Sequence, residues 1–203
     1  MNEKYHIDDI QPSSRKYYKP QIIDAFFKEN EARPYVWNCC YKRNFIIDNS
    51  LSFCENLDLG EDIVFQFGAF MAANSIMFIN DKLYCYNFCT YSSANAMFLN
   101  NPAQRVKRHV AIVKEVEALY TKNSVKRDAQ YARWILDFLF HDTMVLPKGD
   151  RESLIPIIKD LFNEIELKKL CRGVKDKLRR IIFVNQRWHY IYDCYNSLTF
   201  KKR

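Results

Sequence analysis

Glycine and proline are scarce in this 203-residue chain, with four and six copies, which leaves little room for low-complexity linkers. No apolar run reaches the length of a membrane-spanning helix, and the polar first residues, MNEKYHIDDIQPSS, do not resemble a signal peptide. Hydrophobic residues, by contrast, make up 48% of the chain and aromatic residues 15%. This composition indicates a folded globular protein with one good core or two small ones.

The chain also lacks the residue spacing of a structural metal site. Its seven cysteines include no Cys-x-x-Cys pair, and its four histidines are scattered. The sequence therefore predicts neither a zinc site nor a disulfide framework. Buried thiols in a reducing compartment, the cytoplasm, are the simpler interpretation.

The net charge of +7 is unevenly distributed. Residues 1–100 carry 9 Lys and Arg against 12 Asp and Glu, whereas residues 101–203 carry 22 against 12. This asymmetry suggests two regions, the second of which meets an anionic partner such as phosphates or a membrane surface.

The hydrophobic spacing also predicts two regions. In the first, helices are expected at 20–29, 43–49 and 62–73, and strands at 51–53, 75–79 and 82–91, the last two joined by a turn at Asn80-Asp81. In the second, helices are expected near 102–121, 125–144, 151–167 and 168–195, with Asp150 as a cap for the third. The predicted fold class is α/β over 1–100, followed by a mostly α-helical region over 101–203.

The last of these helices is the most amphipathic segment. Its apolar stripe consists of Leu170, Val174, Leu178, Ile181 and Ile182, and Lys and Arg residues surround it. Two interpretations remain open. The segment 168–195 lies on an anionic membrane surface, or it packs against the helical region and leaves a basic face in solvent.

Gly60-Glu61-Asp62 stands at the start of the helix predicted over 62–73. Acidic residues are common in a first helical turn, because they complement its partial positive charge, and glycine adopts backbone angles that other residues avoid. By itself the tripeptide is explained by a helix start. A functional interpretation needs the surrounding residues.

A longer, ordered set of motifs between residues 36 and 96 is more specific. It runs Trp-Asn (37–38), Tyr-Lys-Arg (41–43), Leu-Ser-Phe (51–53), Glu-Asn-Leu (55–57), Gly-Glu-Asp (60–62), a helix, Ile-x-Phe-Ile (76–79), Leu-Tyr-x-Tyr (83–86) and a serine pair (92–93). This order resembles the second half of the catalytic domain in bacterial family 2 glycosyltransferases that build capsular, O-antigen or exopolysaccharide chains. The resemblance implies part of a type-A glycosyltransferase fold.

The resemblance implies an inverting transfer, in which an acceptor hydroxyl attacks the anomeric carbon of a nucleotide-sugar. A base must take the hydroxyl proton, and the resemblance assigns this role to Asp62. Glu61 would orient the acceptor or the neighbouring backbone, and Gly60 would let the chain turn sharply. We expect the field of the helix N-terminus to lower the pKa of Asp62.

The same resemblance assigns Trp37 and Asn38 to the sugar cleft. An aromatic ring can stack on the C–H face of a sugar, and an amide can bond a hydroxyl. The alternatives are a core aromatic for Trp37 and a turn for Asn38. Lys42 and Arg43 match a basic pair of the family, although such residues more often lie on a solvated turn. The chain departs from the family pattern at Cys39-Cys40 and at Asn87.

The family's nucleotide-binding half has no counterpart that we recognise in the sequence. In particular, no Asp-x-Asp motif follows an apolar strand, and Asp8-Asp9 lies in a polar terminus. We therefore expect the chain to supply the acceptor-side half of an enzyme and to be inactive alone. The nucleotide-sugar donor and a divalent metal, Mg or Mn, would bind to the missing half, and no ligand for the metal is identified in this chain.

The implied acceptor is a sugar, for example a lipid-linked one at the inner face of the membrane. An alternative function is a basic helical interaction module, which mediates peripheral membrane docking or oligomerisation. A nucleic-acid-binding module is less favoured, because the acidic first region carries no nucleic-acid fold signature, and no nucleic acid partner is expected.

Overall fold

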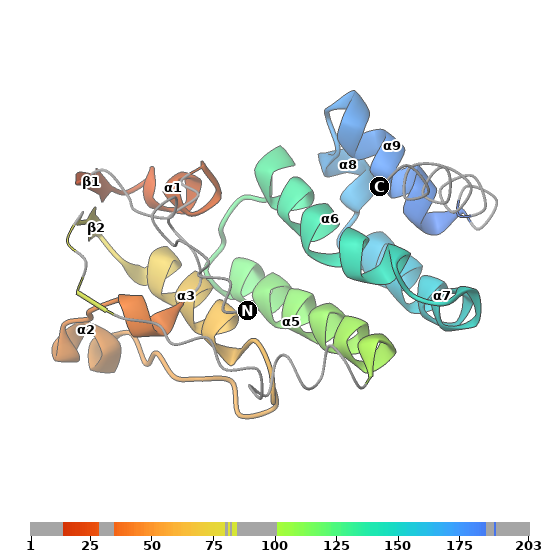
Figure 1. The fold of residues 1–203 in the computed structure, drawn as a ribbon. Coiled ribbons are helices and arrows are strands. Elements are labelled where there is room, and N and C mark those ends of the chain that lie inside the picture. Colours follow the sequence, from red (N-terminus) through yellow and green to blue (C-terminus); the bar gives the residue numbers. More distant parts are fainter. Residues whose placement is uncertain are drawn as a thin grey trace. The chain divides into compact units, whose positions relative to one another are not determined.

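The computed structural model describes residues 14–28, 35–79, 81, 83–84, 101–185 and 189. These residues are mostly helical, with a small two-stranded antiparallel sheet (Figure 1). They divide between two compact units: Met1–Phe88 with Thr121–Val125, and Cys89–Tyr120 with Lys126–Arg203. We call these the first unit and the helical unit.

The sheet of the first unit joins segments that are distant in sequence. Strand β1 (Arg15–Tyr18) pairs antiparallel with β2 (Ser75–Phe78), so that Arg15 lies opposite Phe78. The strand predicted over 75–79 is confirmed. Strand β1 was not predicted, because its sequence RKYY has no apolar alternation and its side chains are mostly exposed. Of the strand predicted over 82–91, only residues 83 and 84 are described, and they are not in a strand.

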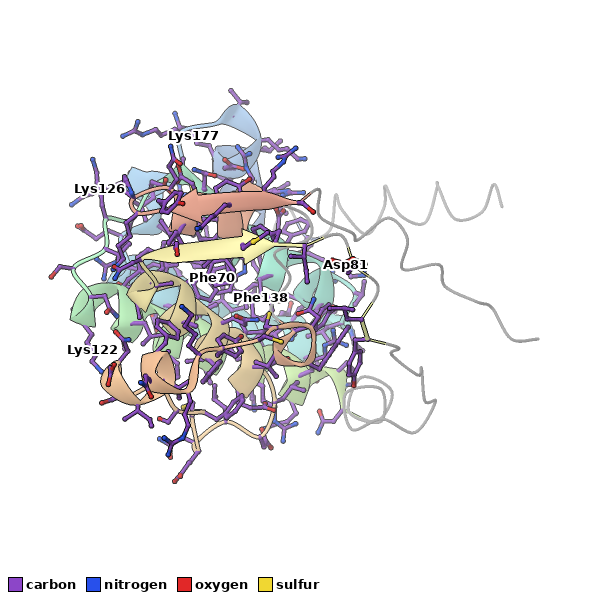
Figure 2. All side chains as sticks on the ribbon, turned by 90° about the vertical axis from the view of Figure 1, so that its left-hand side faces the viewer. Phe70, Asp81, Lys122, Lys126, Phe138 and Lys177 are labelled. Atoms are coloured by element: carbon purple, nitrogen blue, oxygen red, sulfur yellow. The ribbon has the colours of Figure 1, made fainter. Side chains whose placement is uncertain are left out.

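The core of the first unit forms between two helices. Helix α1 (Ile22–Lys28) packs against α3 (Glu61–Ala72). The Phe26 ring lies 4.2 Å from the Phe67 ring and 5.1 Å from the Phe70 ring, which is labelled in Figure 2. The helix predicted over 62–73 is therefore confirmed with small shifts at its ends. The helix predicted over 20–29 is confirmed from residue 22 to residue 28, and residue 29 lies outside the described residues.

The segment 51–53 does not form the strand that was predicted. Helix α2 (Arg43–Asp48) lies just before it, as expected, and the Leu51 amide bonds to the Ile46 carbonyl as the chain leaves that helix. The Phe53 ring stacks on the Phe65 ring at 4.6 Å. Its apolar surface therefore covers α3 instead of joining a sheet.

The helical unit begins with two antiparallel helices, α5 (Pro102–Lys122) and α6 (Ala129–Met144). Arg105 pairs with Asp142 at 2.9 Å, and farther along the pair Tyr131 donates to Glu117 at 2.8 Å. The Asp128 carboxylate caps α6, because it accepts the amides of Gln130 and Tyr131.

Helix α7 (Lys148–Glu164) begins earlier than predicted. Asp150 lies in its first turn and is not the cap, and Pro147 occupies the cap position. Arg151 explains the early start, since its amide bonds to the Pro147 carbonyl and its buried guanidinium donates to the Met144 carbonyl at 3.0 Å. That bond satisfies a free carbonyl at the end of α6.

The predicted helix over 168–195 is interrupted. It divides into α8 (Leu167–Leu170) and α9 (Val174–Val184), which pack against α6 and α7 (Figure 1). Gly173 lies in the interruption, where a Cβ atom would come within 3.2 Å of an Asp176 carboxylate oxygen. Residues 186–188 and 190–195 of the predicted helix lie outside the described residues.

The cap of α6 generates a stability prediction. Replacing Asp128 with Ala removes the acceptor for two amides and is expected to lower the free energy of unfolding by about 1 kcal/mol. Asp128→Asn keeps an acceptor oxygen and is expected to cost much less. Urea denaturation of the three proteins measures the difference, and equal losses for Ala and Asn would contradict the capping role.

Candidate functional site

Gly60 sets the geometry at the start of α3. It is buried, with φ of 80° and ψ of 15°, a left-handed conformation that is strained for residues with a Cβ atom. Its carbonyl accepts the amides of Ile63 and Val64 at 3.1 and 3.3 Å. The sharp turn expected at Gly60 is therefore present, and it brings Glu61 and Asp62 into the first turn of α3.

Asp62 is half-buried, and its carboxylate accepts the backbone amide of Ile63 at 2.8 Å. Burial raises the pKa of Asp62, the neighbouring Glu61 charge raises it further, and the Ile63 amide acts in the opposite direction. The expected lowering of this pKa was wrong, because the loss of water around the carboxylate outweighs the favourable amides at the helix start.

The segment with Trp37 and Asn38 packs against the same helix. It forms the short 3-10 helix η2 (Val36–Asn38), which contacts α3. The Trp37 ring stacks with Tyr35 at 5.0 Å and with Tyr84 at 4.8 Å. Trp37 is thus part of an aromatic stack, of which Tyr84 is the more exposed end, with 56% of its surface accessible.

A polar network connects η2 with α3. Gln66 is 1% exposed and lies one helical turn after Asp62, on the same side of α3. Its carbonyl oxygen accepts the Tyr41 hydroxyl at 2.9 Å, and its amide donates to the Cys39 sulfur at 3.0 Å. The Cys39 thiol in turn donates to the Asn38 side chain at 3.2 Å. Asn38 is therefore linked through two side chains to the helix that carries Asp62.

Gln66 and Tyr41 were not predicted from the sequence as members of the site. The available signal was a single amide in the apolar run VFQFGAF, four residues after Asp62. Burial raises the pKa values of Cys39 and Tyr41, so both groups stay protonated at neutral pH and act as neutral members of the network.

Other candidate groups are more dispersed. Lys42 and Arg43 are exposed at the start of α2, as expected for a solvated turn. Within the described part of the chain, no three His, Cys, Asp or Glu side chains come together in a way that could hold a metal ion. The same residues contain no helix with the length and apolar character needed to cross a membrane.

The helical unit has a separate polar cluster around His109. This side chain is 7% exposed, lies against the Phe138 ring at 4.4 Å, and has its Nδ1 atom 3.5 Å from Asp142, which also pairs with Arg105. Burial lowers the pKa of His109 to about 4, with Asp142 acting against this effect and Arg105 adding to it. The imidazole is therefore neutral at physiological pH, and we assign it a packing role.

Comparisons of the chain with protein-family models, with curated proteins and with solved structures give no match. The site is therefore described by its geometry: a left-handed glycine, a half-buried carboxylate, an aromatic stack and a buried amide network.

Gly60 and Gly149 form a matched pair for testing the turn. Gly60→Ala is expected to lower the free energy of unfolding by about 1–2 kcal/mol, because it forces a residue with a Cβ atom into the left-handed region. Gly149→Ala lies in α7 with no atom within 4 Å of the added Cβ, and it is expected to raise stability by about 0.5 kcal/mol. Thermal unfolding measures both, and a neutral Gly60→Ala would contradict the strain at this turn.

The raised pKa of Asp62 gives a pH-dependent prediction. The charged carboxylate is disfavoured in the folded state. Below the unfolded pKa of about 3.9 the group is protonated in both states and does not change the free energy of unfolding. As the pH rises from there through the higher folded pKa, the group lowers the free energy of unfolding. Asp62→Asn should therefore be more stable than wild type at pH 7, and the difference should shrink toward pH 4. Asp58→Asn, an exposed control in the loop that precedes α3, should not show this gain in urea denaturation.

Proposed function

We propose that the first unit supplies the acceptor-binding and general-base half of an inverting, family 2-like glycosyltransferase. The reaction is the transfer of a sugar from a nucleotide-sugar donor to a growing cell-surface polysaccharide. The observation that carries this proposal is the Asp62 carboxylate, half-buried in the first turn of α3 with a raised pKa, directly after a left-handed glycine.

A partly desolvated carboxylate is suited to general-base catalysis. A raised pKa means that Asp62 holds a proton more tightly, so it is a stronger base than a fully hydrated aspartate. General-base catalysis becomes more effective as the pKa of the base approaches the operating pH. Glu61 lies beside it, partly exposed, and orients the acceptor hydroxyl in this proposal.

The surroundings of η2 support an acceptor-binding role. Tyr84 offers an exposed ring at the end of the stack that contains Trp37, and aromatic rings bind the C–H faces of sugars. Asn38 is exposed, and its position is held by the bond from Cys39. In the proposed site, Trp37 positions Tyr84, and Asn38 bonds a sugar hydroxyl.

The donor side is proposed only for the whole enzyme. The resemblance assigns the nucleotide-sugar and a Mg or Mn ion to a nucleotide-binding half, and the described residues contain no group of metal ligands. In this proposal, the residues described in the first unit bind the acceptor and accept its proton. Lipid-linked acceptors lie at the inner face of the membrane, which places the proposed reaction at the cytoplasmic side.

Genetic complementation tests the role of Asp62. In the organism that carries the gene, deletion is expected to reduce a surface polysaccharide, and the wild-type gene should restore it. Asp62→Asn should restore it at least about 100-fold less efficiently, since that is the lower range for loss of a general base. The readout is polysaccharide per cell, with protein abundance measured in parallel.

Asp58→Asn is the matched control, because it removes an exposed carboxylate from the loop that leads into α3. It should restore wild-type polysaccharide levels. Because Asp62→Asn is expected to be at least as stable as wild type at neutral pH, lost function at normal abundance reports on chemistry and not on folding. Full restoration by Asp62→Asn, or a deletion without any polysaccharide phenotype, would refute the proposed function.

A further inference from the structure

The inward face of α9 is defined by two buried side chains. Asp176 is 1% exposed and pairs with Arg133 of α6 at 3.3 Å. Phe183 is fully buried, with its ring edge-on to Phe140 at 5.3 Å and to Phe162 at 5.5 Å. These contacts fix the rotation of α9 about its own axis relative to α6 and α7.

The outward face of α9 is apolar. Successive residues of an α-helix are rotated by about 100°, which puts Val174, Leu178 and Ile181 on the side opposite Asp176 and Phe183. Their exposed fractions are 84%, 47% and 39%. Three of the five residues of the stripe seen in the sequence therefore face solvent, whereas Leu170 and Ile182 are partly buried. Burial against the rest of the unit does not explain why the three exposed positions are apolar.

Positive charge surrounds this outward face. Lys175 and Lys177 border the stripe on its two sides and are both exposed, and Lys177 is labelled in Figure 2. Between residues 167 and 185 the chain carries seven Lys and Arg residues and a single acidic residue, Asp176, which is buried. Toward solvent, this segment therefore presents an apolar strip between cationic borders.

Charge complementarity distinguishes between the possible occupants of this face. A second copy of the chain would bring two strongly cationic segments together, which repel each other. An anionic lipid surface is compatible with both the apolar stripe and the positive charge. The apolar side chains enter the headgroup boundary, and the lysine ammonium groups reach the lipid phosphates. We propose that α9 docks the protein on anionic membranes through Val174, Leu178 and Ile181, with Lys175 and Lys177 binding lipid phosphates.

The proposed membrane docking does not depend on the Asp62 site. It involves residues of the helical unit only and requires no sugar or nucleotide. Asp62→Asn is therefore expected to bind membranes like the wild type. If the lipid experiment fails, the proposed transferase function is not affected, and the converse also holds.

Vesicle flotation of the full chain tests the proposal. The two probes are vesicles of phosphatidylcholine and vesicles of phosphatidylcholine mixed with phosphatidylglycerol. Binding is expected with the anionic vesicles only, and it should weaken as salt is raised, because screening reduces attraction at the surface. Equal binding to both kinds of vesicle, or to neither, would overturn the proposal.

Two double variants separate the apolar contribution to membrane binding from the contribution of the lysines. Leu178→Ser/Ile181→Ser should reduce partitioning onto anionic vesicles by more than about tenfold, since two apolar side chains no longer enter the headgroup boundary. Lys175→Gln/Lys177→Gln should reduce it by roughly 25-fold at low salt, from about fivefold per lysine.

The chain offers a matched control for each variant. Val145→Ser/Ile157→Ser removes two apolar side chains of similar exposure, 52% and 41%, outside α9, and Lys122→Gln/Lys126→Gln removes the same charge from exposed positions labelled in Figure 2. Both controls should bind like the wild type. Circular dichroism and thermal unfolding verify that all variants fold.

Two further outcomes would overturn membrane docking through α9. If the α9 variants lose no more binding than the controls, the proposal is wrong. If the wild type instead forms a dimer in sedimentation that Leu178→Ser/Ile181→Ser dissociates, without any lipid binding, the outward face is an interface between copies and membrane docking is excluded.

Discussion

The burial of the Asp176 carboxylate is the constraint on which the arrangement of α9 depends. Removing an ion from water is costly unless it is paired, and Arg133 supplies the partner. The other charged groups between residues 167 and 185 are cations, so this carboxylate is the one charged group of the segment that a guanidinium of α6 can hold. Gly173 contributes by leaving the space that a Cβ atom would take next to the carboxylate.

Once Asp176 faces inward, helix geometry determines the rest of α9. Phe183, seven residues later, lies on the same face and fills the space between Phe140 and Phe162. Arg179 lies between them along the helix and pairs with Asp137, so the contacts with α6 recur with each turn. Val174, Leu178 and Ile181 must then point away. The buried face of this helix is thus the one that carries Asp176 and Phe183, and not the one that carries the larger apolar stripe.

The sequence predicted the elements whose signals are local. Periodic apolar residues predicted α3, α5 and α6 with bounds close to those observed. The features that were not predicted depend on contacts with distant parts of the chain. Strand β1 forms because β2 lies beside it some 60 residues later, which no local pattern of RKYY reveals. In the same way, the stripe of α9 was visible in the sequence, but its direction depended on the pair between Asp176 and Arg133.

The candidate site follows the same division. The sharp turn at Gly60 and the position of Asp62 at the helix start are local and were predicted, whereas the network of Gln66, Tyr41 and Cys39 joins residues that are 25 and 27 positions apart. The pKa direction of Asp62 was wrong for a related reason. The field of a helix start is local, but the burial that outweighs it is a property of the folded structure that the local sequence does not show.

Both proposed functional features conflict locally with folding stability. A half-buried carboxylate with a raised pKa and a solvent-facing apolar stripe are each unfavourable in a protein selected only for stability. Elsewhere in the described residues, a carboxylate of this kind has protein partners. Glu117, for example, accepts hydrogen bonds from the Arg127 guanidinium and from the buried Tyr131 hydroxyl. Local inconsistencies of this kind concentrate at functional positions, because a substrate or surface can supply the missing interaction. A sugar hydroxyl would supply it at Asp62, and lipid headgroups would supply it along α9.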